Sequence, residues 1–65
     1  MDKKTYKQTI QTLSTQVNNI MRDVESLQKK CRADKEYYRV TALDFVLHDL
    51  EEADIELCIE LDQLE

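Results

Sequence analysis

The feature of this sequence that most constrains its fold is the complete absence of glycine and proline from its 65 residues. Average usage would supply about four or five glycines and about three prolines in a chain of this length. Because glycine is the residue that adopts positive φ freely, tight β-hairpins, phosphate-binding glycine loops and dinucleotide-binding fingerprints are all disfavoured. The sequence therefore indicates a chain that is almost entirely helical, with a single connection.

An apolar residue recurs at alternating intervals of three and four through the first half of the chain. The row consists of Tyr6, Ile10, Leu13, Val17, Ile20, Val24, Leu27 and Cys31. This spacing is typical of the buried face of a helix that packs as in a coiled coil. Thr5 followed by Gln8 has the form of a capping box, so we expect a helix over residues 5–32.

A second row with the same spacing follows in the other half of the chain. Its members are Val40, Leu43, Leu47, Leu50, Asp54, Leu57, Leu61 and Leu64. On one continuous helix the two rows would lie about 120° apart, so the helix must break between them. Thr41 with Asp44 three residues later is typical of a new helix start. We expect a turn over residues 33–40, a helix over 41–64, and one helical-hairpin domain over 1–65.

The charge distribution favours an antiparallel arrangement of these helices. The formal charge is +4 for residues 1–35 and −9 for residues 36–65, which gives −5 in total. Lysines 3, 4 and 7 begin the first helix and acids 60, 62 and 65 end the second, and each cluster is unfavourable at its helix terminus. Folding the helices antiparallel brings the two clusters together. We therefore predict an all-α, coiled-coil-like hairpin, with a continuous coiled coil as the alternative.

Apolar surface remains after the two predicted helices are paired. The apolar residues of the second helix spread over about 140°, which is wider than one facing helix covers. Phe45, Ile55 and Ile59 lie outside even this arc. Ordering 65 residues costs on the order of 100 kcal/mol, which a two-helix layer offsets poorly. We expect a homodimer that forms a four-helix bundle, or a chain that needs a partner.

The sequence offers no constellation for catalysis or metal binding. His48 has Asp44 and Glu52 four residues to either side, but one imidazole with surface carboxylates is a poor metal site. No histidine is in helical register with Ser14 or Ser26, so no activated nucleophile is indicated. We expect a non-enzymatic protein without a cofactor. No run of 18 apolar residues is present, so we expect no membrane span.

The two cysteines have neither a CxxC nor a zinc-binding spacing. In the predicted hairpin Cys31 and Cys58 lie on the order of 24 Å apart along the bundle, too far for a disulfide. We interpret both as small buried apolar residues of a protein from the reduced cytoplasm.

The acids of the second helix form the most informative surface pattern. Nine acids lie between residues 44 and 65, about one per 3.7 Å, which is close to the spacing of about 3.4 Å between phosphates along one DNA strand. Residues 8–21 contain no charged side chain, so the acids opposite them are poorly neutralised within the chain. Apolar anchors among acids predict a face that binds a basic, partly apolar protein surface. The candidate partner-binding residues are Phe45, Asp49, Glu52, Ile55, Glu56, Ile59 and Glu60.

In size and charge the chain resembles small acidic helical proteins of phages and mobile elements that block host nucleases, restriction or CRISPR systems. This resemblance implies an inhibitor that mimics DNA and occupies a nucleic-acid-binding protein. The net charge of −5 disfavours direct binding to nucleic acid or to an anionic membrane. One alternative is a structural coiled-coil adaptor whose function is self-association.

Another alternative is an RNA-binding dimer resembling ROP, which would use the basic residues of the first helix. These are Lys3, Lys4, Lys7, Arg22, Lys29, Lys30 and Arg32. The uncharged face of residues 8–21 stays open to three interpretations, which are a dimer seam, a neutral outer surface and a partner contact.

Overall fold

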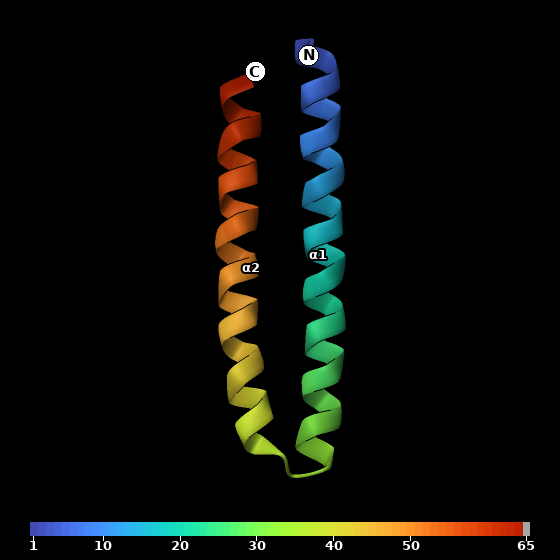
Figure 1. Ribbon diagram of the computed structural model, residues 1–65, viewed down its shortest axis with the longest axis vertical. Helices are drawn as coiled ribbons and strands as arrows, with labels where there is room; N and C mark the ends of the chain where they lie inside the picture. Colours follow the sequence, from blue (N-terminus) through green and yellow to red (C-terminus); the bar gives the residue numbers. More distant parts are fainter. Residues whose placement is uncertain (65) are drawn as a thin grey trace.

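The computed structural model describes residues 1–64 and folds them into a helical hairpin. Helix α1 (Lys3–Ala33) and helix α2 (Tyr37–Leu64) run antiparallel beside each other, with both termini at one end and the connection at the other (Figure 1). The molecule measures 49 × 15 × 14 Å, and no strand occurs within the described residues. The predicted hairpin is confirmed over the continuous coiled coil. Glu65, one of the predicted C-terminal acids, lies outside the described residues.

Helix α1 begins two residues earlier than the capping-box prediction. Asp2 is the N-cap, and its carboxylate accepts a hydrogen bond from the backbone nitrogen of Thr5 at 2.7 Å and another from the Thr5 hydroxyl at 3.1 Å. The first of these bonds satisfies a backbone donor that the first turn leaves free. The bond from the Thr5 backbone, aided by its hydroxyl, also lowers the pKa of Asp2 below its ordinary value. Thr5 therefore lies inside the helix and donates to the cap.

The connection shows how a chain without glycine reverses direction. Lys35 adopts a φ of 61°, the left-handed conformation that glycine usually supplies. The backbone nitrogen of Glu36 donates to the Cys31 carbonyl at 2.8 Å and that of Lys35 to the Arg32 carbonyl at 3.0 Å. This pair of bonds is a Schellman motif, which satisfies the last carbonyls of α1 and turns the chain within three residues.

This compact reversal explains why α2 begins four residues before the predicted start at Thr41. The carbonyl of Glu36 already accepts from the backbone nitrogens of Arg39 at 3.0 Å and Val40 at 3.4 Å. The Thr41 hydroxyl donates to the Tyr37 carbonyl at 3.2 Å and so lies inside the helix. The structure therefore replaces the expected turn over 33–40 with a connection of residues 34–36.

The predicted buried row of α2 is confirmed. Val40 is buried, and every later member of the row is shielded to an intermediate degree by α1. Those later members are Leu43, Leu47, Leu50, Asp54, Leu57, Leu61 and Leu64. The α2 side of the seam is thus an almost uninterrupted row of aliphatic residues, broken only by the carboxylate of Asp54.

The predicted row of α1 is only half correct. Ile10 and Cys31 are buried, and Val17 and Val24 are half-buried, as expected. The other four members are exposed at the flank of the seam, from 36% for Tyr6 to 48% for Ile20. They are Tyr6, Leu13, Ile20 and Leu27. The positions one residue further along face α2 instead, and they are Lys7, Ser14, Met21 and Gln28.

Hydrogen bonding across the seam gives the physical reason for this rotation. Asp54 points toward α1, where its carboxylate accepts from the Ser14 hydroxyl at 2.9 Å and from the Asn18 amide at 3.2 Å. The buried Gln28 amide donates to the Val40 carbonyl at 3.1 Å and to the Asp44 carboxylate at 2.7 Å. Because unpartnered polar groups in a seam are costly, α1 presents donors to α2 and leaves aliphatic residues at the flank.

Candidate functional site

The seven candidate partner-binding residues lie together on the side of α2 that faces away from α1. We call this surface the acidic outer face, and it consists of Phe45, Asp49, Glu52, Ile55, Glu56, Ile59 and Glu60. At 100° per residue these positions span about 140° of the helix. Phe45, Ile55 and Ile59 are 69%, 58% and 50% exposed, respectively. The structure thus brings the predicted residues onto one surface with all three apolar anchors accessible.

The carboxylates of the acidic outer face differ in their partners. Within residues 1–64, Asp49 and Glu56 are exposed and form no ion pair with a lysine or arginine. Glu52 lies 3.1 Å from Nε2 of His48 one helical turn earlier, with both side chains mostly exposed. Glu52, His48 and Asp44 are the three residues whose spacing raised the question of a metal site. No group of residues that could hold a metal ion occurs among the described residues.

Glu60 is bound to the other helix. Its carboxylate accepts a hydrogen bond of 2.8 Å from the hydroxyl of Tyr6 on α1. This bond, with smaller contributions from desolvation and from the charge of Glu60, raises the pKa of Tyr6 above its ordinary value. Glu60 therefore marks the edge of the acidic outer face, where α2 meets α1.

The regular spacing of acids that resembled a row of phosphates is not kept on the outer surface of the hairpin. Asp44 and Asp54 accept hydrogen bonds from Gln28 and from Ser14, and Glu60 from Tyr6, so three of the nine acids are bonded to α1. The outermost carboxylates are those of Asp49, Glu52 and Glu56. Their spacing of three and four residues corresponds to about 5 Å along the helix. The face is thus a patch of carboxylates among apolar side chains.

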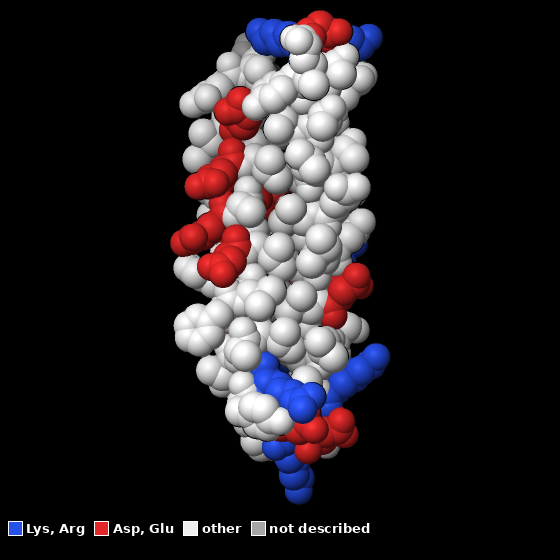
Figure 2. All heavy atoms as spheres, viewed as in Figure 1, with Lys and Arg blue, Asp and Glu red and all other residues white. Residues whose placement is uncertain are grey.

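The charges gather in distinct places on the molecular surface. Figure 2 shows acidic atoms along the edge of α2 and basic atoms near both ends of the hairpin. Between these ends, the same view shows a further acidic patch at the edge of α1, nearer the connection, and a broad surface without charge over the rest of α1 and over the junction of the helices. Apart from Arg22, the basic residues thus gather at the two ends of the hairpin and form no continuous stripe along α1, which weakens the alternative of an RNA-binding first helix.

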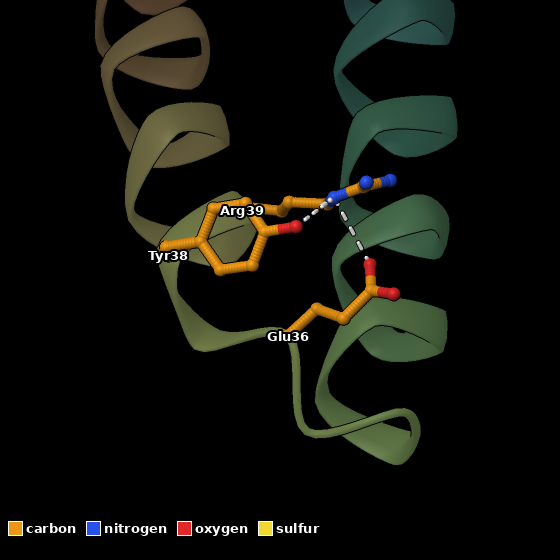
Figure 3. Close-up of polar contacts among 3 residues, drawn as sticks. All are labelled: Glu36, Tyr38 and Arg39. Atoms are coloured by element: carbon orange, nitrogen blue, oxygen red, sulfur yellow. Dashed lines mark hydrogen bonds and ion pairs between the residues drawn. The ribbon is translucent and has the colours of Figure 1, made fainter.

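One of these end clusters lies at the connection. Figure 3 shows the guanidinium of Arg39 between the side chains of Tyr38 and Glu36. The Arg39 Nε donates to the Tyr38 hydroxyl at 2.9 Å and lies 3.1 Å from a Glu36 carboxylate oxygen. These contacts, with that to Tyr38 foremost, raise the pKa of Arg39 above its ordinary value. Arg39 also lies 5.4 Å from the centre of the Tyr38 ring, a cation–π distance.

The cysteines occupy different environments. Cys31 is buried in the seam, as predicted, but Cys58 is exposed, so the prediction that both are buried is wrong for the second. Cys58 follows Leu57 and therefore lies beside the seam, at a position where α1 does not cover it. Both thiols are free, in agreement with the prediction that they do not bridge.

Sequence reasoning missed the polar residues that join the helices. Ser14, Asn18 and Gln28 looked like ordinary surface positions between apolar residues, yet they form the hydrogen bonds across the seam. A signal was available, because Asp54 interrupts a leucine row and requires donors from the facing helix. No pocket is present among residues 1–64, and the acidic outer face is an open helix surface.

No helix within residues 1–64 combines the length and apolar character needed to cross a membrane. Comparisons with protein-family models, with curated proteins and with solved structures return no match.

Proposed function

We propose that this protein is a non-enzymatic inhibitor that binds another protein through the acidic outer face of α2. The observation that carries the proposal is the exposure of Phe45, Ile55 and Ile59 among carboxylates of which two, Asp49 and Glu56, form no ion pair within residues 1–64. Large apolar side chains dominate the energy of protein interfaces when a partner buries them. Carboxylates around such anchors steer and align a partner of opposite charge.

The unpaired carboxylates also favour binding over a purely structural role. Asp49 and Glu56 have no ion pair within the described residues, so binding a lysine or arginine of a partner requires no intramolecular salt bridge to break. Asp49 lies within two turns of Ile55, and Glu56 lies within one turn of both Ile55 and Ile59, on the same side of α2. A partner that fits this face therefore combines basic side chains with apolar surface between them.

Proteins that handle nucleic acid carry basic surfaces of this kind. We therefore propose a target of this class, such as a host nuclease or defence system, which the protein inhibits by occupying the nucleic-acid groove. The resemblance in size and charge to phage and mobile-element inhibitors supports this target class. With outermost carboxylates about 5 Å apart, the face occludes the groove without reproducing the spacing of phosphates. Two free cysteines agree with action in the reduced cytoplasm.

The test compares two fourfold variants that remove the same amount of charge. The face variant carries Asp49→Asn, Glu52→Gln, Glu56→Gln and Glu60→Gln. The control variant carries Asp23→Asn, Glu25→Gln, Glu51→Gln and Asp62→Asn, which lie outside the acidic outer face. Each is immobilised and exposed to lysate of the native host, and captured proteins are identified by mass spectrometry and then challenged with duplex DNA.

We expect the wild type and the control variant to capture the same basic protein, and duplex DNA to displace it. The face variant loses this capture while its far-UV circular dichroism stays helical. Equal capture by the face and control variants would exclude the acidic outer face as the binding surface. Capture that duplex DNA does not affect would contradict the proposed class of target.

The proposal includes a homodimer in the form of a four-helix bundle. Only Ile10, Cys31 and Val40 are buried apolar residues among those described, which is a thin core for a chain of this length. Pairing two hairpins adds apolar burial without adding residues to either chain.

A further inference from the structure

Four large apolar side chains form an exposed row along one flank of α1. Tyr6, Leu13, Ile20 and Leu27 recur every seven residues and are 36–48% exposed, although their spacing is that of a buried row. Seven residues correspond to almost two full turns, so the four side chains lie nearly in line. A regular row of this kind is the pattern of a packing surface and differs from scattered surface leucines.

Helix α2 extends this row across the seam. The hydrogen bond between Tyr6 and Glu60 fixes the level of the two helices on this flank. Because the helices are antiparallel, steps of seven residues place Leu13 level with Ala53 and Ile20 level with Val46. Val46 is 42% exposed, so the apolar surface includes both helices. We call this surface the uncharged flank; it consists of Tyr6, Leu13, Ile20, Leu27, Val46 and Ala53.

The α1 side of this surface is free of charge over residues 8–21, in a chain that is otherwise rich in charge. Lys, Arg, Asp and Glu make up 35% of the sequence, yet residues 8–21 contain none of them. Figure 2 shows the corresponding uncharged surface between the charged ends of the hairpin. Covering it therefore requires little desolvation of ions, whereas covering the acidic outer face requires a partner with compensating cations.

The exposed area of the hairpin exceeds that of a compact monomer by about the area of one interface. The chain exposes 5070 Å² at a mass of 7.7 kDa. A compact monomer of this mass exposes about 4,300 Å², so the hairpin exposes roughly 700 Å² more. That excess is close to the area of about 800 Å² that each partner buries in a standard protein interface.

We propose that a second copy of this chain covers the uncharged flank, with the two connections at the same end of the resulting four-helix bundle. In this arrangement α1 of each copy packs against α2 of the other. The inference rests on the homodimer proposed above and assigns its surface and orientation. It does not depend on the identity of the partner that binds the acidic outer face.

Charge complementarity selects this orientation over the inverted one. With the connections at the same end, Lys3 and Lys4 of one copy lie near Glu60 and Asp62 of the other. Each acidic edge then borders the neutral side chains of residues 8–21. With the connections at opposite ends, Lys3 and Lys4 would lie near Lys29 and Lys30 of the second copy. The acidic edges of the two α2 helices would then also lie side by side, so like charges would meet along α2 and at both ends of the bundle.

The first experiment measures mass by sedimentation equilibrium for two variants with the same chemical change. Ile20→Lys places a charge in the centre of the uncharged flank, and Ile55→Lys places one on the far side of α2. We expect the wild type and Ile55→Lys to sediment at twice 7.7 kDa. We expect Ile20→Lys to weaken the dimer at least 100-fold. A monomeric wild type at several hundred micromolar would overturn both the homodimer and its surface.

Two further outcomes of this experiment bear only on the surface. A dimer that Ile20→Lys leaves intact, or that both variants weaken equally, would exclude the uncharged flank and leave the homodimer itself in place. Loss of partner capture by Ile55→Lys without loss of the dimer would show that the two surfaces act separately. Circular dichroism identifies an Ile20→Lys chain that has unfolded, and the orientation measurement then decides.

The second experiment measures the distance between the two connections by pulsed electron paramagnetic resonance. A single spin label is placed at Lys35→Cys in a chain with Cys31→Ala and Cys58→Ser. Helices in a bundle lie about 8–10 Å apart, so connections at the same end give a label distance of roughly 10–30 Å. A distance near the 49 Å length of the hairpin would overturn the proposed orientation. The absence of any intermolecular distance would overturn the dimer.

Discussion

The two helices use their apolar and polar residues in opposite ways. Helix α2 directs an aliphatic row into the seam and carries its unpaired carboxylates on the outside. Helix α1 places Ser14 and the buried Gln28 in the seam and leaves Leu13 and Ile20 exposed at the flank. The difference shows that the rotation of a helix about its axis depends on which polar groups of the facing helix require hydrogen-bond partners. It does not follow from the most apolar row of its own sequence.

The largest effect is expected where α1 contributes its most buried polar side chain. Gln28 is 4% exposed and donates to the Val40 carbonyl and the Asp44 carboxylate. Gln28→Ala removes both bonds and leaves a cavity, so we expect a loss of about 2 kcal/mol in the free energy of unfolding. Thermal and urea unfolding at one fixed protein concentration measure it.

Gln16→Ala serves as the control, because Gln16 is exposed on the same helix. We expect a change within about 0.5 kcal/mol for this variant. If Gln28→Ala were as mild as its control, the polar contacts would not determine the rotation of α1.

A smaller effect of opposite sign is expected at the polar interruption of the α2 row. Asp54→Leu completes the aliphatic row and removes a partly buried carboxylate, so we expect a gain of about 1–2 kcal/mol. The Asn18 amide keeps another acceptor, because it also donates to the Ser14 carbonyl at 2.8 Å. The same unfolding measurements apply.

Asp49→Leu is the matched control for this variant, since it removes a carboxylate that faces solvent on the same helix. We expect it to change stability by less than about 0.5 kcal/mol. Destabilisation by Asp54→Leu would mean that the hydrogen bonds across the seam contribute more than aliphatic packing does at this position.

The connection between the helices offers a third and smaller effect. Lys35 holds a left-handed conformation that costs a non-glycine residue about 1–2 kcal/mol, whereas glycine adopts it freely but loses about 0.5–1 kcal/mol through its more flexible unfolded chain. We therefore expect Lys35→Gly to stabilise the hairpin by about 0.5–1 kcal/mol in thermal unfolding. Lys30→Gly, within α1, should destabilise it by about 1 kcal/mol. Destabilisation by both would exclude a left-handed residue at position 35.

The smallest effect concerns the hydrogen bond that joins the flank of α1 to the acidic outer face. The bond to Glu60 raises the pKa of Tyr6, so its contribution to stability is fully present below the pKa of an unfolded tyrosine, about 10. It is lost as the pH rises through the higher pKa of the folded state. Tyr6→Phe should remove this loss of stability at high pH. It should also remove the change in ultraviolet absorbance that accompanies ionisation of Tyr6. Tyr37→Phe, at an exposed tyrosine, should leave both unchanged.

The buried row of α2 could be predicted from the sequence, whereas the rotation of α1 could not. The phase shift between apolar rows and the opposite charges of the two halves sufficed to predict an antiparallel hairpin. The α2 row was also predictable, because leucines at 43, 50, 57 and 64 leave no competing face. In α1, Ile10 and Cys31 belong both to the predicted row and to the row that faces α2. The predicted row contains more apolar residues, so periodicity within α1 selects the wrong one.

The choice between the two rows of α1 depends on Asp54 and Asp44 of the other helix, which periodicity within α1 does not contain. The helix ends could not be predicted from apolar spacing either. Asp2 caps α1 and Lys35 adopts the left-handed conformation, and both roles depend on backbone geometry. The acidic outer face was predictable as a set of residues because an outward helix face follows directly from the position of the seam. The bonding of Glu60 to Tyr6 was not, because it required the relative level of the helices.

The threonines of α1 have a consequence for how the molecule behaves among many copies of itself. The hydroxyls of Thr9, Thr12 and Thr15 each donate to the carbonyl four residues earlier, at 2.9–3.1 Å. On the side of α1 turned away from the seam, these three hydroxyl donors are therefore already bonded within the helix. In the proposed dimer the contact between copies is confined to the uncharged flank, so the assembly closes at two chains and leaves no repeated contact from which a filament could grow.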